Sequence, residues 1–296
     1  AETADLIGRA KRALFEARGK RPRPHLDNKI LTSWNALMIS ALAKGYAVLG
    51  EAQYQQAALE AMSFLLASLY DEQSGKLRRT FSGGAGGVEG FLDDYAFLAQ
   101  ALLDVFEITF DPTYLKKAIE LANLGLSRYE DSSGGGFFST VDNAPDLLLR
   151  LKDDYDGAEP SGYSVATDVL VRLANLTEDQ SFATRARRAL QAAGPKLKSQ
   201  PTAAPQLLVA LGRSLAPPAH TVFRVAEIGT EVEKLILEEW KKFEPNHVTL
   251  AVDDNAAEQL PGVCPFLQGL ERKSAITVYR CENFSCSLPQ SIEASA

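Results

Sequence analysis

The chain has 296 residues, of which 46% are hydrophobic, so it is long enough to bury a substantial core in one or two domains. Its formal net charge of -7 argues against nucleic-acid binding, which needs a basic face. No apolar stretch approaches the roughly 18 residues that a membrane span requires. The three cysteines, Cys264, Cys281 and Cys286, form no dense framework, which favours free thiols in a reducing, cytoplasmic compartment.

The first predicted element is a helix with the sequence AETADLIGRAKRALFEAR, which reads like the interior of a longer protein. A targeting segment could therefore precede it, and its presence is left open. The basic residues between positions 9 and 23 are predicted to form a solvated helix face followed by a linker.

The next segment, RPRPHLDNKILTSWN, covers residues 21–35. Its prolines favour an extended chain over residues 21–24. If the extension continues, His25, Asp27 and Lys29 point to the same side. This pattern is typical of a segment that lines a pocket and equally of a solvated linker, and both interpretations stay open.

Amphipathic periodicity predicts paired helices between residues 30 and 215. The first covers residues 30–49, and Thr32 or Ser33 could cap its start. The others cover residues 54–71, 91–110, 113–131, 161–177, 180–199 and 204–215. The pairs recur about every 60 to 70 residues, and such hairpins stack into solenoids or close into toroids. The long loops between pairs are expected on one rim, which favours a one-sided functional face.

The pattern changes after Pro217 and Pro218. Strands are predicted over residues 221–229, 247–254 and 274–284, with a helix over residues 231–243. We therefore predict a helical part over residues 1–215 and a small α/β part over residues 216–296.

One acidic cluster lies at the predicted helix start in VEGFLDDYAF, where Glu89, Asp93 and Asp94 precede Tyr95. Carboxylates in a first helical turn interact favourably with the helix dipole, so this cluster could be purely structural. Adjacent helical residues diverge by about 100°, so one of the two aspartates could instead face a pocket while the other caps the helix.

A second acidic cluster, LKDDYDGAEPSGYS, surrounds Tyr155 and leads into a helix. Its acidic members are Asp153, Asp154, Asp156 and Glu159. The spacing does not match a calcium-binding loop. A carboxylate beside an aromatic ring suits a sugar, because acids exchange protons while flat rings stack on pyranose faces.

The sequence predicts neither a metal site nor a cofactor. Its histidines, at positions 25, 220 and 247, are scattered, and Cys281 and Cys286 are five positions apart, unlike zinc or redox pairs. The glycine-rich segment 82–90, predicted to be a flexible loop, lacks the spacing of a nucleotide-binding turn.

Several motifs together resemble the spermatogenesis-associated protein 20 family: RPRPHLDNKILTSWNALM, GFLDDYAFLAQALLD, GGGFF, LKDDYDGAEPSGYSVA and VYRCENFSC. The resemblance implies a mainly α fold, an incomplete α/α toroid of the six-hairpin type with a small C-terminal α/β appendage. It also implies a thioredoxin-like N-terminal domain that has no counterpart in this chain and that the toroid would contact. The residues at family-motif positions are His25, Asp27, Lys29, Trp34, Asn35, Asp94, Tyr95, Asp154, Asp156, Glu159 and Ser161.

We therefore expect a carbohydrate-active toroid, similar to sugar epimerases or glycosidases, in a protein with a role in spermatogenesis and fertility. The expected acids and bases are Asp94, Asp154, Asp156 and His25. A small sugar would be bound by Trp34, Asn35, Asp27, Lys29, Tyr95, Tyr155, Glu159 and Ser161. The alternative is a non-catalytic scaffold that positions the thioredoxin-like domain, and the sequence does not choose between epimerisation and hydrolysis.

Overall fold

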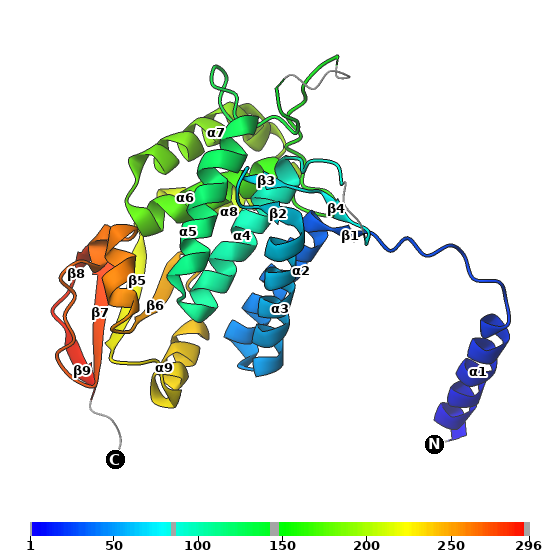
Figure 1. The fold of residues 1–296 in the computed structure, drawn as a ribbon, viewed down its shortest axis with the longest axis horizontal. Helices are drawn as coiled ribbons and strands as arrows, with labels where there is room; N and C mark the ends of the chain where they lie inside the picture. The colour runs from blue at the N-terminus through cyan, green and yellow to red at the C-terminus, as the bar shows by residue number, and fades with distance from the viewer. Residues whose placement is uncertain (1, 84–86, 143–147, 293–296) are drawn as a thin grey trace.

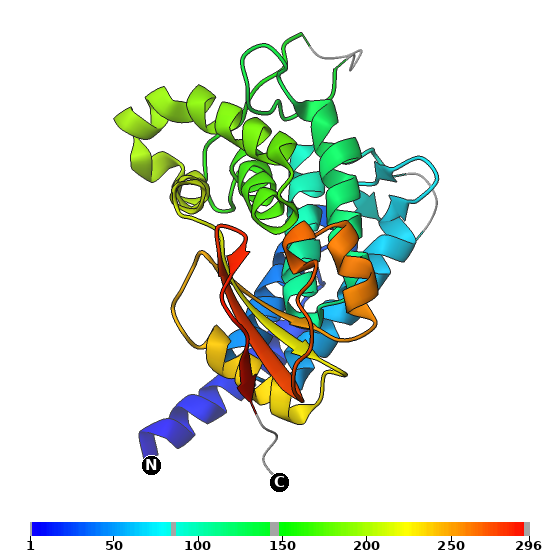
Figure 2. The same ribbon diagram turned by 90° about the vertical axis from the view of Figure 1, so that its left-hand side faces the viewer.

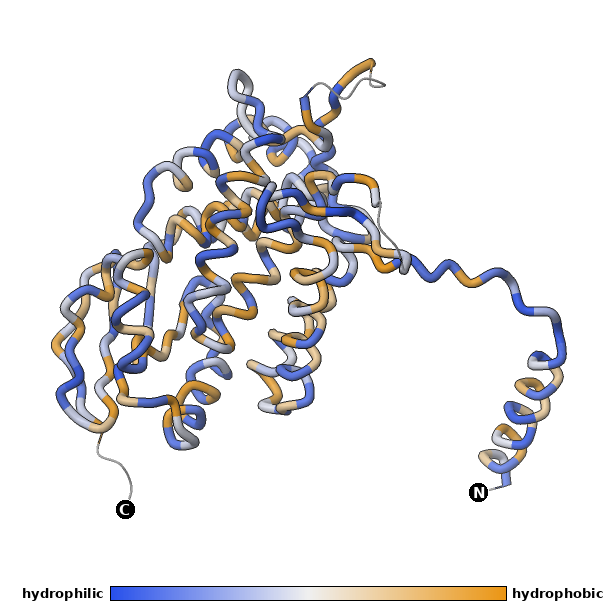
Figure 3. The backbone as a smooth tube through the Cα atoms, viewed as in Figure 1, coloured by the Kyte–Doolittle hydropathy of each residue, from blue (hydrophilic) through white to orange (hydrophobic). Residues whose placement is uncertain are grey.

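A computed structural model of the protein describes residues 2–83, 87–142 and 148–292. It begins with helix α1 (Glu2–Gly19), which buries none of its residues. An extended arm over residues 20–29 connects α1 to the body and holds the helix away from it (Figure 1). The arm is predominantly hydrophilic, which explains why it does not pack (Figure 3).

Three helical hairpins and one further helix form most of the body, as predicted (Figure 1). The helices are α2 (Thr32–Leu49), α3 (Ala52–Leu69), α4 (Leu92–Thr109), α5 (Pro112–Glu120), α6 (Gly162–Thr177), α7 (Gln180–Ser199) and α8 (Pro205–Leu215). Gly50 ends α2 with a φ of 72°, a left-handed conformation that glycine adopts without steric penalty. Asp111 caps α5 by accepting a hydrogen bond from the Thr113 N–H at 2.9 Å.

The first helix of each hairpin packs beside the first helix of the next, in the order α2, α4, α6, α8. The second helices, α3, α5 and α7, pack on the outside of their own partners. Helix α4 lies in the middle of this arc and is buried on nearly all sides. This two-layered arc confirms the predicted fold class, a mainly α, incomplete α/α toroid.

The predicted helix over residues 113–131 is shorter than expected. After α5 the chain forms a π-helical turn, η1 (Leu121–Gly125), and then a 3-10 turn, η2 (Leu126–Tyr129). A Cβ atom on Gly125 would lie 2.4 Å from the Tyr95 ring, so the chain passes unusually close to α4 here. We attribute the change of helix type to this contact.

Short strands cover the end of the arc where the inner helices begin. Strand β1 (Ile30–Leu31) pairs with β4 (Thr80–Phe81), and β2 (Tyr70–Asp71) pairs with β3 (Lys76–Leu77), both antiparallel. Residues 84–86, within the segment predicted to be a glycine-rich loop, lie outside the described residues.

The C-terminal part contains the predicted strands, which form a mixed sheet together with further short strands (Figure 2). Its strands are β5 (Ala219–Val225), β6 (His247–Val252), β7 (Ile276–Glu282), β8 (Ser285–Cys286) and β9 (Gln290–Ile292). The strand order is β6-β5-β7-β8, with β9 also on β7; β5 and β6 are parallel and the other pairs antiparallel. Helix α9 (Thr230–Trp240) contacts α2, and one continuous hydrophobic core runs from the helical arc into this part.

The expectation of three free cysteines is corrected by the structure. Cys281 on β7 lies directly opposite Cys286 on β8, and a disulfide joins them. The sequence spacing did not indicate this pair, because the two side chains are brought together by a tight hairpin turn between the strands. Cys264 is free and buried.

None of the helices in the described part of the chain combines the length and the apolar character needed to cross a membrane.

Candidate functional site

A cavity with a volume of about 970 Å³ lies where the N-terminal ends of α2, α4 and α6 meet. Its aromatic and charged lining residues are Trp34, Phe91, Tyr155, Arg79, Asp93, Asp153 and Glu159. They come from four separate segments of the sequence. The loop that precedes α6 supplies the acidic and aromatic residues at positions 153, 155 and 159.

Asp94 joins the starts of α2 and α4 at the base of the cavity. Its fully buried carboxylate accepts hydrogen bonds from the backbone N–H groups of Ser33, at 3.1 Å, and Phe91, at 2.9 Å. It therefore satisfies free N–H groups at the start of both helices. Burial, reinforced by the neighbouring Asp93, raises the pKa of the Asp94 carboxyl to about 6.

Asp93 turns the other way and lines the cavity. Both of its carboxylate oxygens lie 3.1 Å from Nη1 of Arg79, which also donates to Asp94 at 2.8 Å. The Arg79 guanidinium lies over the Phe91 ring, 5.0 Å from its centroid. One cation thus holds two carboxylates and an aromatic ring in place at the cavity wall.

The start of α6 lies against the start of α4. A Cβ atom on Gly162 would lie 2.8 Å from the backbone N of Asp93, so only glycine permits this close approach. Ser161 caps α6 by accepting from the Ser164 N–H at 3.1 Å. Asp156 accepts from the N–H groups of Ser161 and Gln206, both at 2.8 Å, and so fixes the loop to the starts of α6 and α8.

Of the three aromatic side chains that line the cavity, two are more than half exposed. Trp34, in the first turn of α2, and Tyr155, in the loop before α6, are each 61% exposed. They are separated by more than a hundred residues in the sequence, yet they line the same cavity. Exposed aromatic rings at a concave surface are typical of a binding site.

The structure brings together four of the residues expected to bind sugar, Trp34, Tyr155, Glu159 and Ser161, which all line this cavity. Others lie behind its wall. Asn35 donates through Nδ2 to the Leu31 carbonyl at 2.8 Å, and the buried Tyr95 hydroxyl accepts from the Leu77 N–H at 2.9 Å. Asp94 and Asp156 act as the helix caps described above.

Asp154 forms an ion pair with Lys196 on α7. The Lys196 ammonium also lies over the Tyr155 ring, 5.9 Å from its centroid. This lysine therefore links the acidic loop to the outer layer of the arc. Asp154 is not among the residues that line the cavity.

His25, Asp27 and Lys29 lie on the exposed arm and not at the cavity. Asp27 and Lys29 form an ion pair with each other at 2.9 Å. In this structure the arm has the character of a solvated linker, the second of the two interpretations that the sequence left open (Figure 1).

The sequence did not single out Arg79 and Phe91 as site residues. Arg79 lies on a loop whose sequence carries no recognisable motif, and Phe91 reads as the residue before a helix. The pairing of β4 with β1, across some fifty residues of chain, brings the Arg79 loop to the start of α2. Among the described residues, no group of three or more His, Cys, Asp or Glu side chains is arranged to hold a metal ion.

Comparison with known proteins identifies long relatives of this chain. It is 36% identical over 298 residues to spermatogenesis-associated protein 20 of Rattus norvegicus and 35% identical over 298 residues to that of Homo sapiens. In both cases the alignment covers 96% of this chain and 37% of the relative. The chain therefore spans little more than a third of the length of these proteins. No protein-family model matches it.

Among solved structures, the chain is similar to cellobiose 2-epimerase from Bacillus thermoamylovorans. The TM-score is 0.48 and the sequence identity 17%, over 57% of this chain and 45% of the epimerase.

Proposed function

The chain belongs to the spermatogenesis-associated protein 20 family, and we propose that it binds and transforms a small sugar in the cavity between α2, α4 and α6. The observation that carries the proposal is the exposure of Trp34 and Tyr155 beside the carboxylates of Asp93 and Glu159. Aromatic faces bury the apolar face of a pyranose, while carboxylates and a guanidinium accept from and donate to its hydroxyl groups.

The proposed proton-exchanging groups are Asp93 and, from the loop before α6, Glu159, since both line the cavity and come from different segments. In hydrolysis two such groups would flank the scissile bond, about 5 to 9.5 Å apart. In epimerisation one group would remove a proton beside a carbonyl and the other would return it. Asp94, predicted as an acid or base, enters the proposal as a positioning residue that holds Arg79 and, through it, Asp93.

The experiment is a calorimetric titration of the chain with a panel of neutral mono- and disaccharides. We expect at least one sugar to bind, and Trp34→Ala to weaken it about tenfold, as a loss of roughly 1.4 kcal/mol predicts. The matched control is Leu49→Ala, because Leu49 is 60% exposed on the same helix but lies away from the cavity. Equal binding by both variants, or no binding by the unmodified chain, would contradict the proposal.

Asp93→Asn separates binding from chemistry. It keeps the size of the side chain and removes the charge, so we expect sugar turnover to fall by a factor of about 100 or more while binding changes far less. Glu72→Gln is the control, because Glu72 lies on the surface in an ion pair with Lys117. Turnover that persists in Asp93→Asn would remove this carboxylate from the mechanism.

A second candidate function is a protein-binding scaffold, and the exposed face of α2 favours it. Met38, which also lines the cavity, and Val48 and Leu49, which lie beyond it, are exposed along this helix. An apolar helical face of this kind suits a helix from the part of the longer relatives that this chain does not match. Hydrogen exchange tests this: slower exchange throughout α2 in the full-length protein than in the chain alone, without sugar binding, would favour the scaffold.

A further inference from the structure

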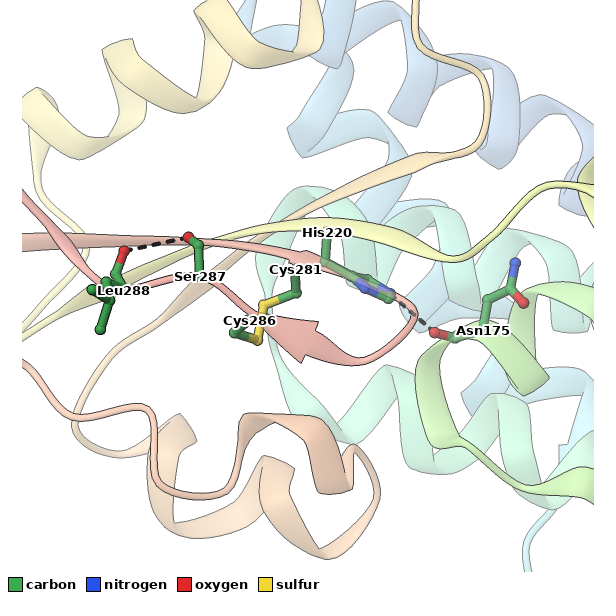
Figure 4. Close-up of a disulfide and its surroundings, with 6 residues drawn as sticks. All are labelled: Asn175, His220, Cys281, Cys286, Ser287 and Leu288. Carbon is green, nitrogen blue, oxygen red and sulfur yellow. Dashed lines mark hydrogen bonds between the residues drawn. A yellow bond between two sulfur atoms is a disulfide. The ribbon is translucent and has the colours of Figure 1, made fainter.

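Three residues form a row across the C-terminal sheet. His220 on β5 lies directly opposite Cys281 on β7, which in turn lies opposite Cys286 on β8. Directly opposite residues project from the same face of a sheet, with Cβ atoms about 4.5 to 5.5 Å apart. The His220 side chain and the Cys281–Cys286 disulfide therefore extend from neighbouring strands on one face of the sheet, and the ring is directed toward Asn175 (Figure 4).

The hydrogen bond that His220 makes determines where its proton sits. Nε2 lies 2.9 Å from the backbone carbonyl of Asn175, at the end of α6. A carbonyl can only accept a hydrogen bond, so Nε2 carries the hydrogen and Nδ1 is a bare acceptor. Burial lowers the pKa of His220 to about 4, so the ring is neutral near pH 7.

The Nδ1 atom of His220 is buried, and among the described residues no group donates a hydrogen bond to it. His220 is 1% exposed, and Phe266 stacks on its ring with the centroids 4.4 Å apart. An unpaired buried acceptor is unfavourable by roughly 1–3 kcal/mol. The neighbouring disulfide cannot relieve this, because it has no hydrogen to donate.

We propose that the Cys281–Cys286 disulfide is a thiol–disulfide exchange site for a dithiol, and that Nδ1 of His220 stabilises its reduced form by accepting a hydrogen bond from the Cys281 thiol. Reduction creates an S–H group in the row beside the unpaired acceptor. The reduced state thus gains a hydrogen bond that the oxidised state lacks. The acceptor is His220, which the register of β5 against β7 places opposite Cys281.

The exposure of the two sulfur-bearing residues sets the order of the exchange. Cys286 is partly exposed, whereas Cys281 is buried. The incoming thiolate attacks Sγ of Cys286 and forms a mixed disulfide, and Sγ of Cys281 is the leaving group. Sγ of Cys281 then takes up a proton, and the resulting thiol donates a hydrogen bond to Nδ1 of His220. The second thiol of the reductant then attacks the mixed disulfide, so that the dithiol is oxidised to a disulfide and both cysteines become thiols.

The test is a redox titration of the chain in buffers of reduced and oxidised dithiothreitol, quenched by alkylation and read by peptide mass. We expect His220→Phe, which keeps an aromatic ring but has no acceptor, to lower the equilibrium constant for reduction about three- to fivefold, as one net hydrogen bond predicts. A tenfold change corresponds to 29.6 mV for this two-electron couple. Phe266→Leu is the control: it alters the packing on the same ring and leaves Nδ1 in place, so it should shift the constant less than twofold.

An unchanged or raised constant in His220→Phe, or no Cys281–Cys286 disulfide in the oxidised chain, would overturn the proposal. A second measurement uses the unmodified chain, so its result does not depend on whether a variant folds. The ¹⁵N resonance of Nδ1 in His220 should move when the disulfide is reduced, because the nitrogen acquires a donor. An identical resonance in both redox states would also overturn the proposal.

Discussion

Asp93 and Asp94 are adjacent in the sequence but have different roles in the structure. The sequence predicted that one of the two would face a pocket and the other would cap, and named Asp94 for chemistry. In the structure Asp93 lines the cavity and Asp94 caps two helices. Helix α4 is buried on nearly all sides, so its apolar pattern does not indicate how it is rotated about its axis. Only tertiary packing settles which carboxylate points outward.

The raised pKa of Asp94 predicts how stability depends on pH. Its ordinary value is 3.8 and its folded value about 6, so between these values the folded protein binds more protons than the unfolded protein. The free energy of unfolding then falls as pH rises through this window. Measured by urea unfolding, the stability of the unmodified chain relative to Asp94→Asn should decrease by about 2 kcal/mol between pH 4 and pH 7. A relative stability that increases with pH would mean that Arg79, and not burial, governs this carboxyl.

At the level of elements, the cavity depends on how closely α6 approaches α4. We expect Gly162→Ala to destabilise the protein by about 1–3 kcal/mol, because the added methyl would meet rigid backbone at Asp93. Gly212→Ala in α8 is the matched control, since a Cβ atom there meets nothing within 4 Å. It should stabilise the helix by about 0.5–1 kcal/mol. Thermal or chemical unfolding checks both, and equal effects at the two glycines would refute the close contact.

Helix α1 and the arm make a different prediction. Because α1 buries no residue, deleting residues 1–27 should change the free energy of unfolding by less than about 0.5 kcal/mol. Equilibrium unfolding in urea measures this. A loss of more than about 2 kcal/mol would show that α1 packs on the body in solution.

The elements themselves were largely predictable. Helices α2 to α8 follow the 3.6-residue period, and strands β5, β6 and β7 follow the switch in pattern after Pro218. The break after α5 was not predictable, because it arises from contact between Gly125 and Tyr95 on another helix. The cysteine pair was missed for the same kind of reason: strand register, not sequence spacing, sets which residues face each other.

At the level of the whole molecule, the arc of inner helices explains why the candidate site is where it is. Helices α2, α4 and α6 all begin at one end of the arc, so the loops that precede them meet there. The sequence predicted such a one-sided face and named Trp34, Tyr155 and Glu159 as sugar-binding residues, and these three line the cavity there. It could not place His25, Asp27 and Lys29, because the direction of an extended arm depends on contacts that the local sequence does not encode.

Saturation-transfer NMR with the sugar that binds best in the panel tests most directly whether Trp34 and Tyr155 hold the sugar. We expect magnetisation to pass from the protein to the hydrogens on one apolar face of the sugar ring. This transfer should be lost in the double variant Trp34→Ala, Tyr155→Ala and kept in Leu49→Ala. Transfer that survives the double variant, or that is equally weak in all three proteins, would show that sugar is not held between these two rings.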